Sequence, residues 1–184
     1  MGRWEPGARE RLARAALDLY VERGFDETSV GDIAARAGVT ERTFFRHFAD
    51  KREVLFQGSA VLQQRVVDAI AAADHRLTPL QIMITVMRET QDYFPDHDFV
   101  AARQAAIDRN TSLRERELLK LATMRAAAAD ALRARGVDDL SADLAADAGV
   151  SLFHQGFHRW VAGAAPDLVS GIDDAASALR GLTA

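Results

Sequence analysis

The stretch SVGDIAARAGVTERTFFRHFADK, residues 29–51, holds the features that decide the fold of the N-terminal part of the chain. Ser29 and Thr40 are residue types that favour the position just before a helix, and Gly38 is suited to the turn that ends one. Two short helices separated by a tight turn with glycine are typical of a helix-turn-helix unit. We therefore expect short helices over 29–37 and 40–48, the second with a polar face turned outward.

Basic residues concentrate in the same stretch, although the chain as a whole is acidic. The 184 residues hold 23 Lys and Arg against 27 Asp and Glu, a net charge of −4. Residues 36–52 nevertheless carry more basic than acidic side chains. Charge alone favours a solvated helical surface. The motif favours DNA contact instead, because a helix fits the major groove and an arginine can donate two hydrogen bonds to guanine.

Helical periodicity extends over the rest of the chain. Apolar residues recur at i, i+3, i+4 and i+7, and the four prolines fall at plausible helix edges, so we predict an all-α fold. We expect an N-terminal helix-turn-helix DNA-binding domain, 1–52, joined to a larger C-terminal helical ligand-binding and dimerisation domain, 53–184. The other helices are expected near 8–23, 50–73, from 79 onward, 98–109, 112–135, 141–164, and from 166 or 170 to 182.

Composition and motifs exclude several classes of protein. Without cysteine there is no disulfide framework, thiolate zinc site or cysteine nucleophile. The serine in Gly149-Val150-Ser151 lacks the second glycine of a nucleophile elbow, and no phosphate-binding loop or dinucleotide fingerprint is present. We expect neither an enzyme nor a cofactor.

The expected location is the cytoplasm, without a membrane partner. No apolar run approaches the roughly 20 residues that cross a bilayer. Residues 1–6 show no hydrophobic signal segment.

The N-terminal residues resemble the tetracycline-repressor (TetR) family of bacterial transcription regulators. Beyond residue 60 no motif of that family is found. The resemblance is carried by Thr28-Ser29-Val30, Asp32-Ile33-Ala34, Ala37-Gly38-Val39-Thr40, Thr43-Phe44-Phe45-Arg46-His47-Phe48 and Asp50-Lys51.

The resemblance implies DNA-binding roles for residues at the start of both helices. Ser29 and Thr40 occupy the cap positions that touch phosphates. Glu41, Arg42 and Thr43 occupy base-facing positions of the recognition helix. Glu41 either accepts a hydrogen bond from cytosine or only favours the helix N-terminus.

The resemblance also assigns backbone contacts further along, with two departures from the family pattern. Arg46 faces DNA, and His47 and Lys51 occupy phosphate-contacting positions, with a cap or core hydrogen bond as the alternative for His47. Phe45 replaces the usual tyrosine, so an apolar or sugar contact replaces a phosphate hydrogen bond. Gly31 stands where a basic residue often reaches a base.

A stripe of glycines in the C-terminal part favours close approach of another helix. Each glycine inside a helix costs about 1 kcal/mol relative to alanine, so three of them at seven-residue spacing need a reason. We expect the helix near 141–164 and the last helix, from 166 or 170 to 182, to form a four-helix bundle with a second copy, although packing within one chain would explain the glycines too. The predicted interface comprises Gly149, Leu152, Gly156, Gly163, Ile172, Ala176 and Leu179.

A regulatory pocket is expected in the same domain. Methionines and aromatics at helical spacing more often form core than ligand contacts. The candidates are Met83, Met87, Phe94, Arg103, Met124, His154, Phe157 and His158. His158 follows His154 by four residues, which is metal-ligand spacing on a helix. Because no third ligand is evident from the sequence, we expect no metal.

The resulting hypothesis is repression relieved by a ligand. A homodimer would hold two recognition helices on a palindromic double-stranded operator, and a small-molecule effector would favour a second conformation that binds the operator less well. A ligand-independent or activating regulator of the same fold, and more remotely a helical protein-interaction module, are the alternatives.

Overall fold

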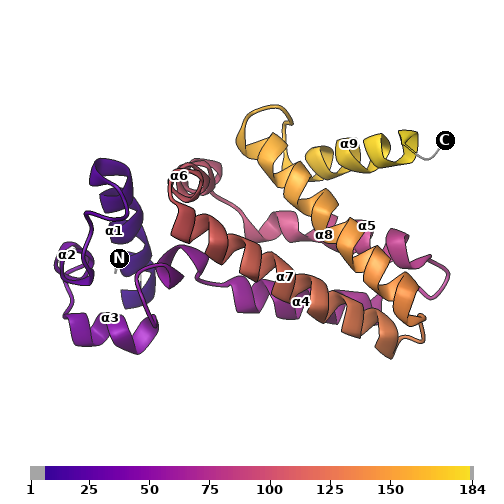
Figure 1. Cartoon of the computed structure of the whole chain (residues 1–184), viewed down its shortest axis with the longest axis horizontal. Helices are drawn as coiled ribbons and strands as arrows, with labels where there is room; N and C mark the ends of the chain where they lie inside the picture. The colour runs from indigo at the N-terminus through magenta and orange to yellow at the C-terminus, as the bar shows by residue number, and fades with distance from the viewer. Residues whose placement is uncertain (1–6, 183–184) are drawn as a thin grey trace, which may run out of the picture. The chain divides into compact units, whose positions relative to one another are not determined.

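The computed structural model describes residues 7–182, and no strand occurs within that range. It divides into two compact units (Figure 1). Unit 1 comprises the chain up to Gly58 together with 102–117, and unit 2 comprises 59–101 together with the chain from Leu118 onward. The predicted all-α class is confirmed. The domain boundary predicted at residue 52 stays a prediction. Residues 1–6, on which the argument about a signal segment relied, lie outside the described residues.

Unit 1 is built on α1 (Ala8–Arg23), α2 (Val30–Arg36) and α3 (Glu41–His47), followed by the short 3-10 helix η1 (Glu53–Phe56). The three α-helices bury one common set of apolar side chains, which includes Leu12, Ile33 and Phe44, each fully inaccessible to solvent. The short α2 and α3 are stabilised mainly by this packing, because isolated helices of such length are marginal in water.

The ends of these helices follow the sequence closely. The Ser29 Oγ accepts a hydrogen bond from the Asp32 amide at 3.1 Å, and the Asp32 carboxylate accepts one from the Ser29 amide at 2.9 Å. The Thr40 Oγ1 accepts from the Thr43 amide at 3.2 Å. Gly38 has φ +68°, a conformation that L side chains rarely adopt. The predicted caps and turn are therefore confirmed.

The predicted helix over 50–73 is wrong in its first turns. The Asp50 carboxylate does accept from the amides of Arg52 and Glu53, as a cap would. Only η1 follows, however, and Gly58 has φ +83°, so α4 (Ser59–Ala72) begins nine residues after Asp50. Burial of Val54, Leu55 and Phe56 against unit 1 accounts for the separate turn.

Unit 2 contains α4 and most of the remaining elements, which are α5 (Pro79–Glu89), η2 (Thr90–Tyr93), α6 (His97–Asp108), α7 (Thr111–Ala134), α8 (Asp139–Val161) and α9 (Leu168–Gly181). Of these, α6 and α7 each continue into unit 1. Its centre is α8, which packs against α5 and α9 (Figure 1). Asp138 and Asp167 cap α8 and α9, so both helices begin at other residues than the sequence suggested. No described helix is long and apolar enough to span a membrane.

The glycine stripe packs within the chain, and this corrects the argument that assigned it to a second copy. A Cβ on Gly156 would lie 2.6 Å from the backbone nitrogen of Ile172, and one on Gly149 would lie 2.6 Å from the Cβ of Met83. Gly163 follows the end of α8 with φ +72°, so it serves the turn. The other predicted interface residues Leu152, Ile172 and Ala176 are buried in the single chain, and Leu179 is half-buried.

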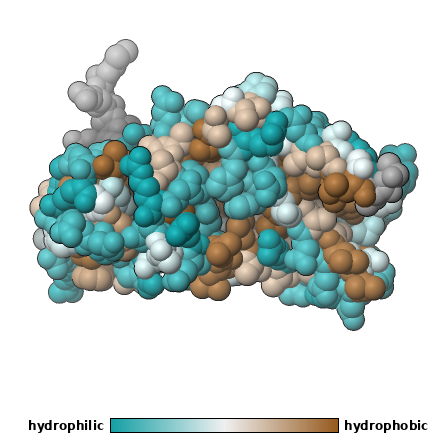
Figure 2. Space-filling view, turned by 45° about the horizontal axis from the view of Figure 1, so that its top comes forward, coloured by the Kyte–Doolittle hydropathy of each residue, from teal (hydrophilic) through white to brown (hydrophobic). Residues whose placement is uncertain are grey.

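Large apolar side chains are nevertheless exposed in unit 2. Leu140 and Leu144, four residues apart on α8, are 69% and 60% exposed. The same side of the helix continues through Ala148, Ser151 and Gln155, none of which is buried. Hydrophobic areas interrupt the otherwise largely hydrophilic face of the molecule drawn in Figure 2. This α8 stripe (Leu140, Leu144, Ala148, Ser151 and Gln155) is therefore a side of the helix that carries exposed apolar residues and is not buried by its own chain.

Candidate nucleic-acid interface

The outer face of α3 is polar and exposed, with one large apolar residue. Phe44 points into the core, whereas Glu41, Arg42 and Arg46 are exposed and Phe45 is 55% exposed. Residues 42 and 46 are four positions apart and residue 45 is three positions from 42, so the two arginines share one side of the helix and Phe45 borders it next to Arg42. This face suits a helix that enters a groove, because it presents two cationic donors beside an exposed apolar side chain.

The structure separates the basic residues of 36–52 into engaged and available ones. Arg36 forms a bidentate ion pair with Glu22, with both N–O distances at 2.9 Å, and Arg52 pairs with Asp50 at 2.7 Å. By contrast, neither Arg42 nor Arg46 forms an ion pair with any residue between 7 and 182. These two are therefore the arginines of the motif whose donors remain open to an external acceptor.

Lys51 is engaged within unit 1. Its Nζ donates to the carbonyl oxygens of Phe25 at 2.8 Å and Thr28 at 2.9 Å, lies 3.5 Å from that of Asp26, and sits 4.3 Å from the Phe25 ring centroid. An ammonium has three donors, and all of them point at backbone carbonyls. The phosphate contact predicted for Lys51 stays a prediction, and it would require these bonds to break.

Tyr20 was not among the residues singled out from the sequence. Its hydroxyl donates to the Lys51 carbonyl at 2.6 Å from a buried position on α1, 31 residues away. Burial and the nearby Asp50 carboxylate raise the pKa of the Tyr20 phenol, which therefore stays a hydrogen-bond donor. Tyr20 thus fixes the backbone that follows α3. A tyrosine in an apolar helix stripe gives no signal of such a distant partner.

The other residues predicted to contact DNA differ in exposure and in the hydrogen bonds that they already form. The hydroxyls of Ser29 and Thr40 are exposed but occupied in caps, and Thr43 is half-buried beside Thr40, with 3.1 Å between their hydroxyl oxygens. His47 is half-buried, and its Nε2 is buried without a hydrogen-bond partner among the described residues. A phosphate contact by His47 would therefore need its other nitrogen or a rotated ring.

Glu41 leans over Gly31. Its Oε1 lies 2.7 Å from the position that a Cβ on Gly31 would occupy. The missing side chain on α2 thus leaves room for the carboxylate of α3. In the sequence, Gly31 departs from the family pattern and Glu41 has two alternative roles. Their proximity follows from the packing of α2 on α3 and could not be predicted from the sequence.

The ligand candidates do not form one group. Met83 and Met87 are fully buried, and Met124 and Phe157 are nearly so, in the core of unit 2. Phe94 is half-buried, with its ring centroid 5.3 Å from that of Phe157. Arg103 instead belongs to unit 1, where its Nε donates to the Leu55 carbonyl and its guanidinium lies 5.1 Å from the Phe56 ring centroid. His154 and His158 contact each other, as described below.

The arrangement of unit 1 defines a class of protein, the helix-turn-helix DNA-binding regulators. Residues 12–57 match the sequence model of the family described as bacterial regulatory proteins, tetR family. This match makes the N-terminal part of the chain similar to the TetR family, and the relatives that follow are similar to the chain as well.

Among the curated relatives is the HTH-type transcriptional regulator TcmR of Streptomyces glaucescens. It is 36% identical over 80 residues, which are 44% of this chain and 35% of that protein. The chain therefore matches about a third of the length of that relative, and the match supports the N-terminal part rather than the whole.

Solved structures resemble the chain over nearly its full length. FadR of Thermus thermophilus, a TetR-family repressor solved with lauroyl-CoA, is 26% identical with a TM-score of 0.53, covering 94% of this chain and 93% of FadR. A protein of Syntrophomonas wolfei described as a TetR-family regulator has a TM-score of 0.66 at 18% identity, covering 95% and 94%. The second likeness concerns the fold alone.

Proposed function

We propose that this chain binds double-stranded DNA through α3 and regulates transcription in the bacterial cytoplasm. The observation that carries the proposal is the pair of exposed arginines, Arg42 and Arg46, which share one side of α3 beside Phe45 and have no acidic partner among the described residues. Exposed cationic donors on a capped helix match guanine edges and phosphates.

A binding experiment tests this proposal. Genomic fragments that flank the coding region are screened by mobility shift, and the affinity of the best fragment is measured over a series of salt concentrations. Log affinity should fall linearly with log salt, because phosphate contacts release counterions. Arg42→Ala should weaken the free energy of DNA binding by about 1–3 kcal/mol and relax base preference. The control is Arg76→Ala in unit 2, where Arg76 pairs with Asp74, and this variant should bind DNA like the wild type. Absence of binding to every duplex at low salt would overturn the proposal.

We infer that the regulator acts as a homodimer. A single helix-turn-helix unit binds weakly, whereas two units related by a two-fold axis read a palindrome. Since the glycine stripe is covered by its own chain, the α8 stripe is the better candidate face for the second copy. Its leucines are exposed, and its small residues Ala148 and Ser151 allow a helix to approach closely.

Sedimentation of a charged variant tests the dimer. Leu144→Asp should give monomers, because a carboxylate cannot be buried unpaired in an apolar contact. Val21→Asp makes the same change at a residue of unit 1 that is 52% exposed, and it should remain dimeric. A dimeric Leu144→Asp protein, or a monomeric wild type, would contradict the inferred interface.

We further propose that an effector molecule with a large apolar part, such as an acyl chain, is bound in unit 2 and releases the operator. Support comes from the methionines and aromatics that fill this unit and from the relative that was solved with lauroyl-CoA. Lauroyl-CoA is therefore the first probe to titrate into the protein–operator complex. Binding of the probe with loss of operator affinity would support the switch, whereas binding without that loss would refute the switch but not DNA binding.

A further inference from the structure

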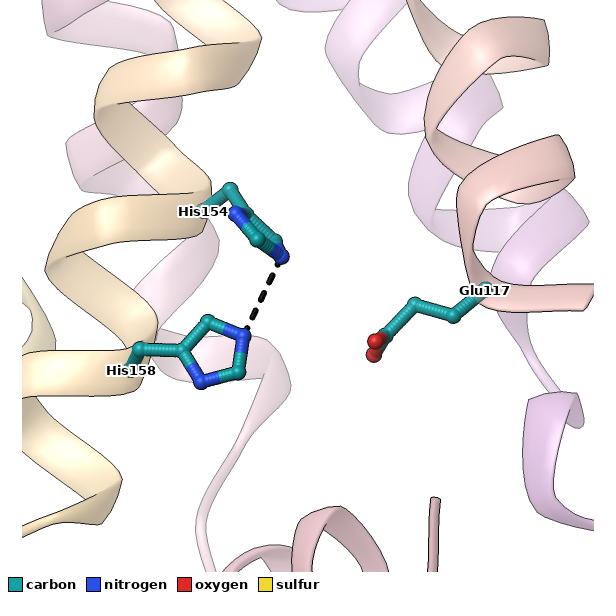
Figure 3. A group of neighbouring side chains, drawn as sticks. All are labelled: Glu117, His154 and His158. Atoms are coloured by element: carbon teal, nitrogen blue, oxygen red, sulfur yellow. Dashed lines mark hydrogen bonds between the residues drawn. The ribbon is translucent and has the colours of Figure 1, made fainter. Parts of the chain in front are cut away.

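Two histidines on successive turns of α8 face each other. The Nε2 atoms of His154 and His158 are 3.1 Å apart, and the ring centroids are 4.5 Å apart at an interplanar angle of 75° (Figure 3). Both side chains are half-buried and lie in unit 2. Glu117, the third side chain drawn in Figure 3, belongs to unit 1. The sequence predicted the shared helix face, but not that the two Nε2 atoms would converge.

The distance between these atoms suits a shared metal ion. Imidazole nitrogens bind zinc at about 2.0–2.1 Å, and two such bonds to atoms 3.1 Å apart enclose an angle of roughly 100°, close to tetrahedral geometry. Both Nε2 lone pairs would then point at the ion, and the ring protons would reside on Nδ1. Without an ion, the same contact needs one Nε2 to carry a proton and the other to accept it.

We propose that His154 and His158 together bind one divalent transition-metal ion through their Nε2 atoms, with solvent among its remaining ligands. Imidazole favours Zn²⁺, Ni²⁺ and Cu²⁺ over Mg²⁺ and Ca²⁺, which prefer oxygen ligands. Half-burial leaves a route for the ion, and the nearby Phe157 ring, with its centroid 6.3 Å from that of His158, lowers the local polarity. This geometry revises the sequence-based expectation of no metal. It does not depend on the proposed DNA binding.

The other histidines of unit 2 are differently placed and provide the control. His75 is exposed, and its Nδ1 lies 3.4 Å from a guanidinium nitrogen of Arg135. His97 Nε2 lies 3.4 Å from the Trp160 carbonyl oxygen. Neither has a second imidazole against it, so neither should chelate.

Metal titration of the full chain, prepared without a histidine tag, tests the proposal. ZnCl2 and NiCl2 are titrated by calorimetry into the wild type and into His154→Gln, His158→Gln and the control His75→Gln. We expect one ion per chain in the wild type and the control, and at least a tenfold lower association constant in each variant of the pair. Melting curves recorded by circular dichroism show that each variant is folded.

A second readout identifies the ligands directly. On addition of Zn²⁺, the imidazole NMR signals of His154 and His158 should shift together, while those of His75 stay in place. The proposal is overturned if the wild type binds no ion, if binding survives both substitutions, or if only one of the two imidazoles responds.

Discussion

At the scale of single residues, Lys51 joins the loop before α2 to the segment after α3. Its ammonium donates to the carbonyls of Phe25 and Thr28, whose own backbone lies 26 and 23 residues earlier in the chain. A hydrogen bond to a charged group contributes more than a neutral one, and a buried carbonyl left without a donor is costly. The role of Lys51 in the free protein is therefore to hold the helix-turn-helix unit in shape.

Lys51→Met keeps the apolar stem of the side chain but removes the donors. We expect the free energy of unfolding to fall by about 1–3 kcal/mol, measured by urea denaturation. Arg42→Met is the matched control, because an exposed side chain without an ion pair should change stability by no more than about 0.5 kcal/mol. If Lys51→Met unfolds like the wild type and only binds DNA less tightly, the phosphate role suggested by the sequence is the correct one.

At the scale of the helix, the cap of α2 makes a pH-dependent contribution. Hydrogen bonds from the hydroxyl and amide of Ser29, and the Arg23 guanidinium 2.7 Å away, lower the pKa of the Asp32 carboxyl. Because the folded state lowers this pKa, the stabilisation is present above the ordinary aspartate value of about 3.9 and is lost as the pH falls through the lower folded value.

Carboxyl NMR titration measures the cap directly. Asp32 should titrate below the ordinary range in the wild type, and Ser29→Ala should move its midpoint upward while costing about 0.5–2 kcal/mol of stability at neutral pH. An unchanged Asp32 midpoint in Ser29→Ala would show that Arg23, rather than the cap, lowers this pKa.

The contact between α8 and α9 gives a prediction that opposes helix propensity. In an isolated helix, Gly156→Ala would raise the stability of the helix by about 1 kcal/mol. Its Cβ would instead meet the α9 backbone at Gly171 and Ile172, between 2.6 and 2.8 Å away, and backbone cannot yield as a flexible side chain can. We expect a net loss of about 1–3 kcal/mol in urea unfolding. Gly181→Ala, with no atom within 4 Å, should not destabilise, and a stable Gly156→Ala would mean that α9 is not packed this closely.

The same elements show what a sequence can and cannot specify. Helix ends such as Ser29 before α2, Gly38 after it and Thr78 before α5 were predictable, because cap hydrogen bonds join residues only a few positions apart. The start of α4 was not, because the residues of η1 are buried by packing that lies beyond the local pattern. The partner of Gly156 was equally hidden, since a glycine stripe records close approach but not which helix approaches.

The candidate site was predictable in outline and not in detail for the same reason. The sequence pattern placed Arg42 and Arg46 on the outer face of α3, the resemblance to the TetR family implied an outward contact for Phe45, and the structure exposes all three. Which basic residues remain available depends on partners from elsewhere in the chain. Arg36 pairs with Glu22, which lies 14 residues earlier, and Lys51 donates hydrogen bonds to backbone carbonyls that follow α1. Tertiary packing therefore determines which basic side chains remain available to contact DNA.

At the scale of the whole molecule, the proposed dimer would couple dimerisation and operator reading through geometry. Two recognition helices related by a two-fold axis read half-sites about 34–36 Å apart, or a multiple of that distance. An insertion of five base pairs at the centre of the operator, about half a turn of B-DNA, moves the half-sites to opposite faces. Wild-type affinity for the altered operator, measured by fluorescence anisotropy at fixed salt, should therefore fall at least tenfold.

The Leu144→Asp variant separates the dimer from the DNA contact in that experiment. As a monomer it should bind the original and the altered operator with equal, weak affinity, because a single α3 reads one half-site and is insensitive to spacing. Its Arg42 and Arg46 remain in place, so the dependence on salt should persist with fewer phosphates neutralised and a shallower slope. If the wild type itself tolerates the insertion, each chain reads DNA independently, and the α8 stripe must then serve another purpose than holding two reading heads at operator spacing.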